Sequence, residues 1–320
     1  MKNKLRKLLF LSKRYSNKLF VKFNKSKFNK RVAIVSCDKW VGKVKEDELL
    51  KFELNKLFVD VDIISWQDKS IDYSKYDALI IRSLWGYQDY IDEFIKYLDY
   101  LKKEKITVYN DIQILKDNLN KYEQFKILDK YKIPHIETFF LKSNELDEVG
   151  KINKKYKDLV LKPIISGSGN NTFIISDTIK KNNIKVTEVK GKFNGVLNDI
   201  NNYLMVQPFV KEIDDGEISV VLINNEISHI VVRNTSVFND KGSIMVLDLD
   251  SMNDKMKSIV DRCSNIKEYK DALYMRVDLV KIDDDYKVME LELVEPQLFL
   301  GFRKTKKELV KFAKAIRKKI

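Results

Sequence analysis

Cysteine and histidine are scarce in this chain of 320 residues, which holds two of each. Cys37 and Cys263 show no paired spacing, so the sequence predicts neither a disulfide framework nor a thiolate metal site. Such cysteine usage fits a reducing, cytoplasmic location. His135 follows Pro134, and His229 lies inside an apolar, strand-like run. We interpret both histidines as structural.

Long apolar runs are also missing. The longest, such as Leu8–Leu11 and Val220–Ile223, are far shorter than the roughly 20 residues that a membrane-spanning helix needs. A secretory signal is not expected, because Lys13 and Arg14 closely follow the first of these runs. With 44% hydrophobic residues, the chain is long enough for a globular, soluble protein with more than one packed layer.

Acidic residues are absent from residues 1–30, a basic arm with eleven Lys or Arg that carries most of the formal net charge of +13. The rest of the chain is nearly neutral, so the net charge does not indicate a nucleic-acid partner. Apolar residues of the arm recur at spacings of three and four, as on one side of a helix: Leu5, Leu8, Leu9, Leu19, Phe20 and Phe23. Three interpretations stay open, namely a helix packed on the protein body, a solvated tail, and an interfacial helix on anionic lipid or a partner.

Residues 31–117 alternate short apolar runs with two helical stretches, at 46–58 and 89–103. This order predicts an α/β domain with a largely parallel sheet, whose ligands gather at the carboxyl ends of the strands. The segment RSLWGY follows one such strand. Arg82 is suited to clamp a substrate carboxylate, with Ser83 and Trp85 beside it. The alternative is that these residues only close the edge of the domain.

Residues 118–320 are richer in strands and mostly antiparallel in pattern. A predicted helix over 116–132 is followed by seven β-type runs, a helix over 254–269, two further strands and a basic helix over 304–320. We place a subdomain boundary near residue 206. No internal repeat and no low-complexity linker is found.

Three carboxylates are predicted to converge on the last two strands. Alternation places Asp278 on one face of its strand and places Glu290 and Glu292 together on one face of the next. A turn at residues 283–285 would pair these strands as a hairpin. Acids on such an apolar surface repel one another unless a cation joins them, and Mg²⁺ prefers oxygen ligands of this kind. The alternative is a hairpin whose polar face meets water.

A glycine- and serine-rich loop, ISGSGNNT, follows the strand that carries Lys162. The backbone N–H groups of Ser166, Gly167, Ser168 and Gly169 could close on phosphates, and Lys162 could reach one. The loop lacks the spacing of a P-loop, and a plain hairpin turn is the alternative.

A third motif combines an interrupted strand with an acid. The strand YLMVQPFV cannot continue regularly at Pro208, so its free backbone groups could pair with a flat heterocycle. Glu217 follows a turn at residues 215–216 and could accept hydrogen bonds from ribose hydroxyls. Without further context, the same segment is a hinge between subdomains.

In this order the motifs LVLKP, the Gly/Ser loop, MVQPFV with DGE, and RVDLV with MELELVEP resemble the ATP-grasp superfamily. They are most similar to its prokaryotic glutathione synthetase-like and D-cycloserine ligase-like branch. The segments DALIIRSLWGY and NLNKYEQFKILDKYKIPHIET resemble that branch as well. The resemblance implies an ATP-grasp fold: a Rossmann-like pre-ATP-grasp domain at 31–117, and two α+β subdomains that clasp ATP within 118–320.

The resemblance also implies roles for individual residues. Lys121 and Lys162 would contact ATP phosphates under a cover formed by residues 166–172, and Arg233 would meet the transferred phosphoryl group. The adenine would lie against Gln207, Phe209 and Val210, the ribose on Glu217, and Mg²⁺ or Mn²⁺ on Asp278, Glu290 and Glu292. Related proteins often carry Asn at the position of Glu292, and Asp and Thr at the positions of Gly86 and Leu84, so the metal number and the substrate are not transferred.

The implied activity is an ADP-forming ligase that joins a small-molecule carboxylate and an amine through an acyl phosphate. Lys162 and Arg233 are its expected catalytic residues. Two alternatives are a phosphotransferase or kinase on the same scaffold, and a non-catalytic nucleotide-binding module tethered by the basic arm. Nucleic-acid binding is not expected, and the sequence predicts no oligomeric state.

Overall fold

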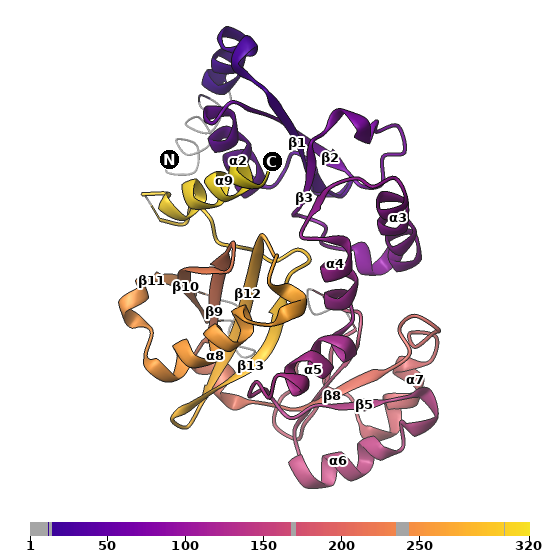
Figure 1. Ribbon diagram of the computed structural model, residues 1–320. Helices are drawn as coiled ribbons and strands as arrows, with labels where there is room; N and C mark the ends of the chain where they lie inside the picture. The colour runs from indigo at the N-terminus through magenta and orange to yellow at the C-terminus, as the bar shows by residue number, and fades with distance from the viewer. Residues whose placement is uncertain (1–11, 13–14, 168–170, 235–242, 304) are drawn as a thin grey trace. The chain divides into compact units, whose positions relative to one another are not determined.

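The computed structural model describes residues 12, 15–167, 171–234, 243–303 and 305–320. The chain divides into two compact units (Figure 1). Unit 1 comprises residues 1–84, 92–112 and 295–320, and unit 2 comprises residues 85–91 and 113–294. In the described part of the chain, no helix is long and apolar enough to cross a bilayer.

Unit 1 is built on a four-stranded parallel sheet in the order β2-β1-β3-β4. The strands are β1 (Lys30–Ser36), β2 (Val59–Ser65), β3 (Ala78–Ile81) and β4 (Val108–Tyr109). Residues 32–35 of β1 are fully buried, as expected for a parallel strand covered on both faces. Helices α2 (Lys45–Lys56), α3 (Ile91–Lys103) and α9 (Lys307–Lys319) belong to this layer. The expected α/β domain is therefore present.

Helix α9 groups with unit 1, although the sequence analysis assigns it to the domain at 118–320. Its apolar face buries Leu309, Phe312 and Ile316, and the helix contacts α2. The guanidinium of Arg82 lies 5.7 Å from the centroid of the Phe312 ring. The C-terminal helix thus completes the core of a layer that begins about 280 residues earlier in the chain. The domain boundaries themselves stay a prediction.

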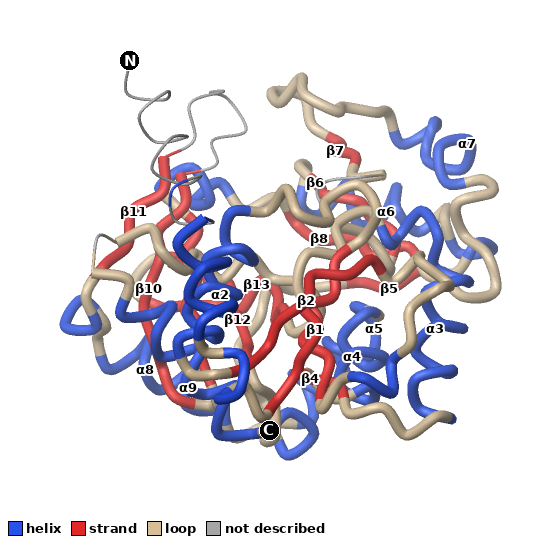
Figure 2. Tube along the Cα trace, turned by 90° about the horizontal axis from the view of Figure 1, so that it is seen from above, coloured by secondary structure: helices blue, strands red, loops and turns tan. Residues whose placement is uncertain are grey.

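Unit 2 contains two antiparallel sheets, which can be followed in Figures 1 and 2. The smaller has the order β5-β8-β6-β7, from β5 (Phe139–Leu141), β6 (Leu159–Pro163), β7 (Phe173–Ile175) and β8 (Leu204–Pro208). Helices α6 (Glu148–Tyr156) and α7 (Val189–Phe193) bury Val149, Val189 and Phe193 in its core. Strand β8 lies inside the sheet and ends at Pro208, where the ladder stops.

The larger sheet has the order β11-β10-β9-β12-β13. Its strands are β9 (Glu217–Ile223), β10 (Glu226–Asn234), β11 (Ser243–Leu247), β12 (Tyr274–Ile282) and β13 (Asp285–Glu292). One face joins a hydrophobic core with α8 (Asp254–Ser264), through residues such as Val220, Met275 and Val277 on the sheet and Val260 on the helix. Because side chains alternate along a strand, the intervening residues of each strand lie on the opposite face.

Two expected helices differ from those observed. The stretch 116–132 belongs to two helices, α4 (Ile112–Leu119) and α5 (Lys121–Lys130), separated at Asn120. The Asn120 side chain accepts hydrogen bonds from the N–H groups of Tyr122 and Glu123, so it caps α5 and starts a new helix. The expected helix over 254–269 ends at Ser264 and is followed by a short 3₁₀ turn.

The 3₁₀ turns of the described residues are η1 Lys25–Lys27, η2 Tyr73–Lys75, η3 Tyr87–Tyr90, η4 Ser143–Glu145, η5 Val186–Glu188, η6 Lys211–Asp215, η7 Leu249–Ser251 and η8 Lys267–Tyr269.

Candidate functional site

The face of the larger sheet turned away from α8 gathers most of the expected phosphate- and metal-binding residues. Strand register places Ser219 beside Asp278, and Asp278 beside Glu290. One row along, Arg276 pairs with Glu292, and on the other side Arg233 pairs with Glu217. The predicted hairpin between β12 and β13 is present, with a register irregularity after Asp278. The three acids therefore share one face of the sheet, as the alternation along the strands predicts.

Asp278 is the most completely bonded acid of this face. Its carboxylate accepts hydrogen bonds from Ser219 Oγ at 2.6 Å and from Arg233 Nη2 at 3.0 Å. Arg276 donates to both carboxylate oxygens, at 2.8 and 2.7 Å. Burial alone would raise the pKa of Asp278, but the two arginines outweigh it and lower the pKa to about 2. Asp278 is thus held as a carboxylate.

Arg276 is a site residue that the sequence analysis did not assign. Its side chain is 4% exposed and bridges Asp278 to Glu292 across the hairpin. The only signal in the sequence is that Arg276 lies two residues before Asp278 and therefore on the same face of β12. A buried guanidinium with two acidic partners supplies fixed positive charge to the centre of this face.

Glu290 joins the two sheets of unit 2 through two lysines. Lys121, the first residue of α5, lies 2.9 Å from one Glu290 oxygen and donates at 2.9 Å to the carbonyl oxygen of Ser166. Lys162 of β6 lies 3.8 Å from the other oxygen. Burial lowers the pKa of Lys162, and the neighbouring Lys121 lowers it further. Burial opposes ionisation of Glu290, but the two lysines hold its pKa below the ordinary value.

The pKa values of Glu217 and Glu292 are shifted upwards, whereas those of Asp278 and Glu290 are shifted downwards. Burial and the negative charge of Asp278 raise the pKa of Glu217 to about 8, against the opposing effect of Arg233, its ion-pair partner. Burial likewise raises the pKa of Glu292 to about 7; Arg276 opposes this, and Asp278 and Glu290 add to it. Burial is the main cause of both raised pKa values, because the four acids of the site are matched in number by Arg233, Arg276, Lys121 and Lys162.

A divalent cation fits the carboxylate oxygens that this face presents. Among the residues that the structure describes, no three His, Cys, Asp or Glu side chains are grouped closely enough to hold a metal ion by themselves. Asp278 and Glu290 do lie opposite each other, and Mg²⁺ commonly binds one or two carboxylates together with substrate phosphates. A cation bound here would favour the ionised form of Glu292 and so lower its raised pKa.

The Gly/Ser loop begins beside these lysines. The backbone oxygen of Ser166 is held by Lys121, and a side chain at Gly167 would meet the Gln88 amide, since a Cβ there would lie 2.2 Å from Gln88 Nε2. Ser166 and Asn171 border a hollow of about 260 Å³. Ser168 and Gly169 lie outside the described residues, and the role of the loop as a cover stays a prediction.

The expected adenine segment lies at the end of β8. The Gln207 amide donates to Thr138 Oγ1 at 2.9 Å, and the N–H of Phe209 donates to the carbonyl oxygen of Asp158 at 2.9 Å. Val210 is the N-cap residue of the 3₁₀ turn η6, which leads to Glu217. The N–H of Phe209 is thus already engaged, so backbone contact with a base through this segment would use other groups. The assignment stays a prediction.

The expected substrate residues belong to different units. Arg82 and Ser83 lie in unit 1 and Trp85 in unit 2. Arg82 is 4% exposed, donates to the Pro296 carbonyl oxygen at 3.1 Å and pairs with Glu46 at 3.3 Å.

Ser83 donates to Asp47 at 2.5 Å. Burial raises the pKa of Glu46 to about 7, although the charge of Arg82 opposes this. These contacts favour the alternative in which Arg82 closes its own domain.

Both histidines make local contacts. His135 contacts the Ile136 carbonyl oxygen at 2.8 Å and Asp129 at 2.9 Å, and its ring packs edge-on against Phe125. His229 is 1% exposed and lies 3.1 Å from Ser228 Oγ. These contacts agree with structural roles.

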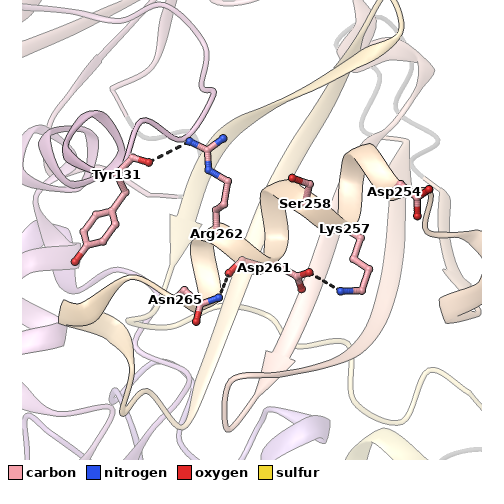
Figure 3. Close-up of a pocket in the computed structure, with 7 residues that line it drawn as sticks. All are labelled: Tyr131, Asp254, Lys257, Ser258, Asp261, Arg262 and Asn265. Carbon is pink, nitrogen blue, oxygen red and sulfur yellow. Dashed lines mark hydrogen bonds and ion pairs between the residues drawn. The ribbon is translucent and has the colours of Figure 1, made fainter.

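A separate hollow of about 490 Å³ runs along the outer side of α8 (Figure 3). Three of its charged residues have local partners: Lys257 pairs with Asp261, and Arg262 donates to the Tyr131 carbonyl oxygen. None of the residues expected in the site lines it.

Two family models match the chain. Residues 32–110 match the N-terminal domain of D-cycloserine synthetase DcsG, and residues 126–275 match the ATP-grasp domain of prokaryotic glutathione synthetase. No curated protein sequence matches.

Several solved structures share the fold. D-cycloserine synthetase DcsG is 17% identical with a TM-score of 0.75, over 90% of this chain and 99% of that one. An ATP-grasp RimK domain protein from Sphaerobacter thermophilus is 12% identical with a TM-score of 0.66, over 89% and 98%. D-alanine–D-alanine ligase from Bacillus anthracis is 17% identical with a TM-score of 0.59, over 91% and 99%. The fold class expected from the sequence is confirmed.

Proposed function

Because the chain belongs to the ATP-grasp superfamily, we propose that it is an ATP-dependent carboxylate–amine ligase. A carboxylate oxygen of the first substrate attacks the γ-phosphorus of ATP, and ADP leaves. The amine nitrogen of the second substrate then attacks the carbonyl carbon of the acyl phosphate. Phosphate leaves, the amine loses a proton, and an amide or peptide bond remains.

One observation supports this proposal above the others: four cations pair with four acids at one place in unit 2. Lys121 and Lys162 approach Glu290 from a helix and from the other sheet, whereas Arg233 and Arg276 approach Asp278. Such a cluster is not favoured for stability alone, because buried ion pairs often stabilise the folded state no more than apolar residues in their place. Phosphoryl transfer, in contrast, needs fixed positive charge around the moving phosphoryl group.

The proposed roles follow the positions of these groups. Lys121 and Lys162 leave their ion pairs with Glu290 and bind ATP phosphates. Arg233 and Arg276 stabilise the transferred phosphoryl group. Asp278, Glu290 and Glu292 hold Mg²⁺, or Mn²⁺ in its place, which neutralises phosphate charge when bound.

Glu217 holds the ribose, the backbone of residues 207–210 lines the adenine, and residues 166–172 exclude water from the acyl phosphate.

The partners are a small-molecule carboxylate and an amine, and we propose a cytoplasmic location. Both cysteines are buried free thiols, as expected of a reducing compartment.

The test follows ADP and phosphate release by the purified protein with Mg-ATP and pooled carboxylic acids and amines. Release that requires both an acid and an amine, with a product of the condensed mass, is expected. Glu290→Gln should lower kcat/KM at least about 100-fold. Glu226→Gln, at an exposed position on β10 of the same sheet, is the matched control and should retain activity. A phosphorylated product without an amine would instead identify a kinase, and ATP binding without turnover in any pool would favour a binding module.

A further inference from the structure

The basic arm contains a helix over residues 15–23, one side of which packs on unit 1. The ring of Phe20 stacks on that of Phe58 with centroids 6.0 Å apart, and Phe28 meets the same ring edge-on at 6.0 Å. The Asn24 amide donates to the Phe20 carbonyl oxygen at 3.0 Å and so closes the end of the helix. The helix is therefore seated on the protein, as one of the interpretations of the sequence anticipated.

Packing through Phe20 leaves a second apolar stripe on the outer side. Tyr15, Leu19 and Phe23 are spaced by four residues and are 67%, 37% and 78% exposed. Residues four apart lie one above the other on a helix, so the three side chains form one continuous stripe. Three of the nine exposed large apolar side chains of the described chain fall within these nine residues. Scattered exposed apolar residues are ordinary, but an aligned set marks an interaction surface.

The charged residues of the arm itself are all basic. Lys18 and Lys22 stand next to Leu19 and Phe23 in the helix, and both lysines are exposed. Residues 1–30 contain no acidic residue. At the end of the arm, Arg317 of α9 donates to the Asn29 side chain at 3.3 Å and brings further basic residues of the C-terminal turn to the same region. A partner for this surface must accept aromatic and aliphatic side chains and be negatively charged around them.

We propose that this outer stripe docks on an anionic phospholipid surface. A bilayer interface accepts tyrosine and phenylalanine rings at the depth of the headgroups, and anionic lipids attract the flanking lysines. Long lysine side chains can keep their ammonium groups in water while their methylene stems lie along the apolar surface. The inner stripe, held by Phe58, fixes the helix to unit 1, so that binding brings the whole protein to the membrane.

The two contributions make binding reversible and sensitive to salt. Raising the ionic strength from about 0.1 M to 1 M shortens the Debye length from about 10 Å to 3 Å, which removes most of the attraction between lysines and lipid headgroups. Each lysine close to an anionic surface is worth roughly a fivefold change in partition. The apolar stripe alone is short, so neither contribution suffices without the other.

The experiment measures co-sedimentation of the full-length protein with vesicles. One set contains equal parts of phosphatidylglycerol and phosphatidylcholine, and the other contains phosphatidylcholine only. The protein is expected to sediment with the anionic vesicles at about 0.1 M salt and to stay in solution with neutral vesicles, or at about 1 M salt.

Two double variants separate the contributions. Leu19→Ser with Phe23→Ser should lower the partition at least about tenfold, and Lys18→Glu with Lys22→Glu should lower it about as much or more. The matched controls lie on α3 of the same unit. Tyr100→Ser, at a side chain 48% exposed, and Lys102→Glu with Lys103→Glu should leave the partition unchanged or reduce it less than twofold. All variants should retain the far-UV circular dichroism and melting temperature of the wild type, because every substituted side chain is exposed.

Equal binding to neutral and anionic vesicles would overturn the proposal, as would binding that the Leu19→Ser, Phe23→Ser variant leaves intact. The second result would mean electrostatic adsorption alone. Absence of vesicle binding, together with a dimer in light scattering that the same variant abolishes, would assign the stripe to a protein interface instead. Because none of these readouts uses ATP or a substrate, they fail or succeed independently of the proposed ligase activity.

Discussion

At the scale of single residues, Arg276 keeps the buried acids of this face paired. Without it, Asp278 would keep Ser219 and Arg233 as partners but lose two of its hydrogen bonds, and Glu292 would lose its ion-pair partner. A buried charge whose partner is removed is destabilising, even where the complete pair contributes little. Arg276 therefore serves both the stability of unit 2 and the charge of the proposed phosphoryl site.

Arg276→Gln should lower the free energy of unfolding by about 3–5 kcal/mol, because it leaves buried carboxylates unpaired. Urea denaturation followed by circular dichroism measures this loss. Lys281→Gln is the matched control: Lys281 is half exposed on the same strand and should change stability by less than about 0.5 kcal/mol. A similar small effect of Arg276→Gln would show that the buried network does not depend on this guanidinium.

Glu217 predicts an unusual pH dependence. Its pKa is raised from the ordinary value of 4.5 to about 8, so between these values the folded protein binds a proton that the unfolded chain does not. The stabilisation is fully present below about pH 4.5 and is lost as pH rises through 8. Asp278 acts in the opposite sense at low pH, since its lowered pKa favours the folded state above the ordinary value of 3.8.

Melting temperatures of the wild type should therefore fall from pH 5 to pH 8, and Glu217→Gln should flatten that part of the curve. Glu226→Gln, at an exposed position on the neighbouring strand, should leave the slope of the wild type. An unchanged slope in Glu217→Gln would mean that other groups, such as Glu292, determine it.

At the scale of elements, alternation along β12 and β13 sufficed to predict that Asp278, Glu290 and Glu292 share a face. It could not predict which cations meet them. Lys121 reaches Glu290 from α5 across 169 positions of sequence, and such a contact leaves no local pattern. The prediction of a single helix at 116–132 was wrong at Asn120. The apolar spacing continues across this position, and only the capping side chain of Asn120 indicates that a new helix begins there.

This break positions the first lysine of the site, since Lys121 is the first residue of the helix that Asn120 caps. Asn120→Ala should cost about 1 kcal/mol of stability in urea denaturation and should weaken ATP binding measured by calorimetry, as the first turn of α5 frays. Asn120→Asp retains an acceptor for the same N–H groups and should preserve both quantities. Equal ATP affinity in Asn120→Ala and the wild type would argue against a phosphate-binding role for Lys121.

At the scale of the whole molecule, local sequence patterns could not predict which segments of the chain make up unit 1. The parallel sheet could be read from residues 31–117 because each strand is a short apolar run followed by a helical stretch. The assignment of α9 to the same unit depends on packing between residues hundreds of positions apart. An amphipathic helix at a chain end buries its apolar face on whichever layer offers a matching surface, and its sequence does not name that layer.

Phe312→Ala tests whether α9 is part of the core of unit 1. Phe312 is fully buried there, and its removal should cost about 3–5 kcal/mol. Hydrogen exchange measured by mass spectrometry should show faster exchange in β1, α2 and α9, while β9 and β12 exchange as in the wild type. Leu279→Ala, in the core of unit 2, is the matched control with the reverse pattern. Equal acceleration of all five elements by Phe312→Ala would show that the two units open together rather than as separate cooperative bodies.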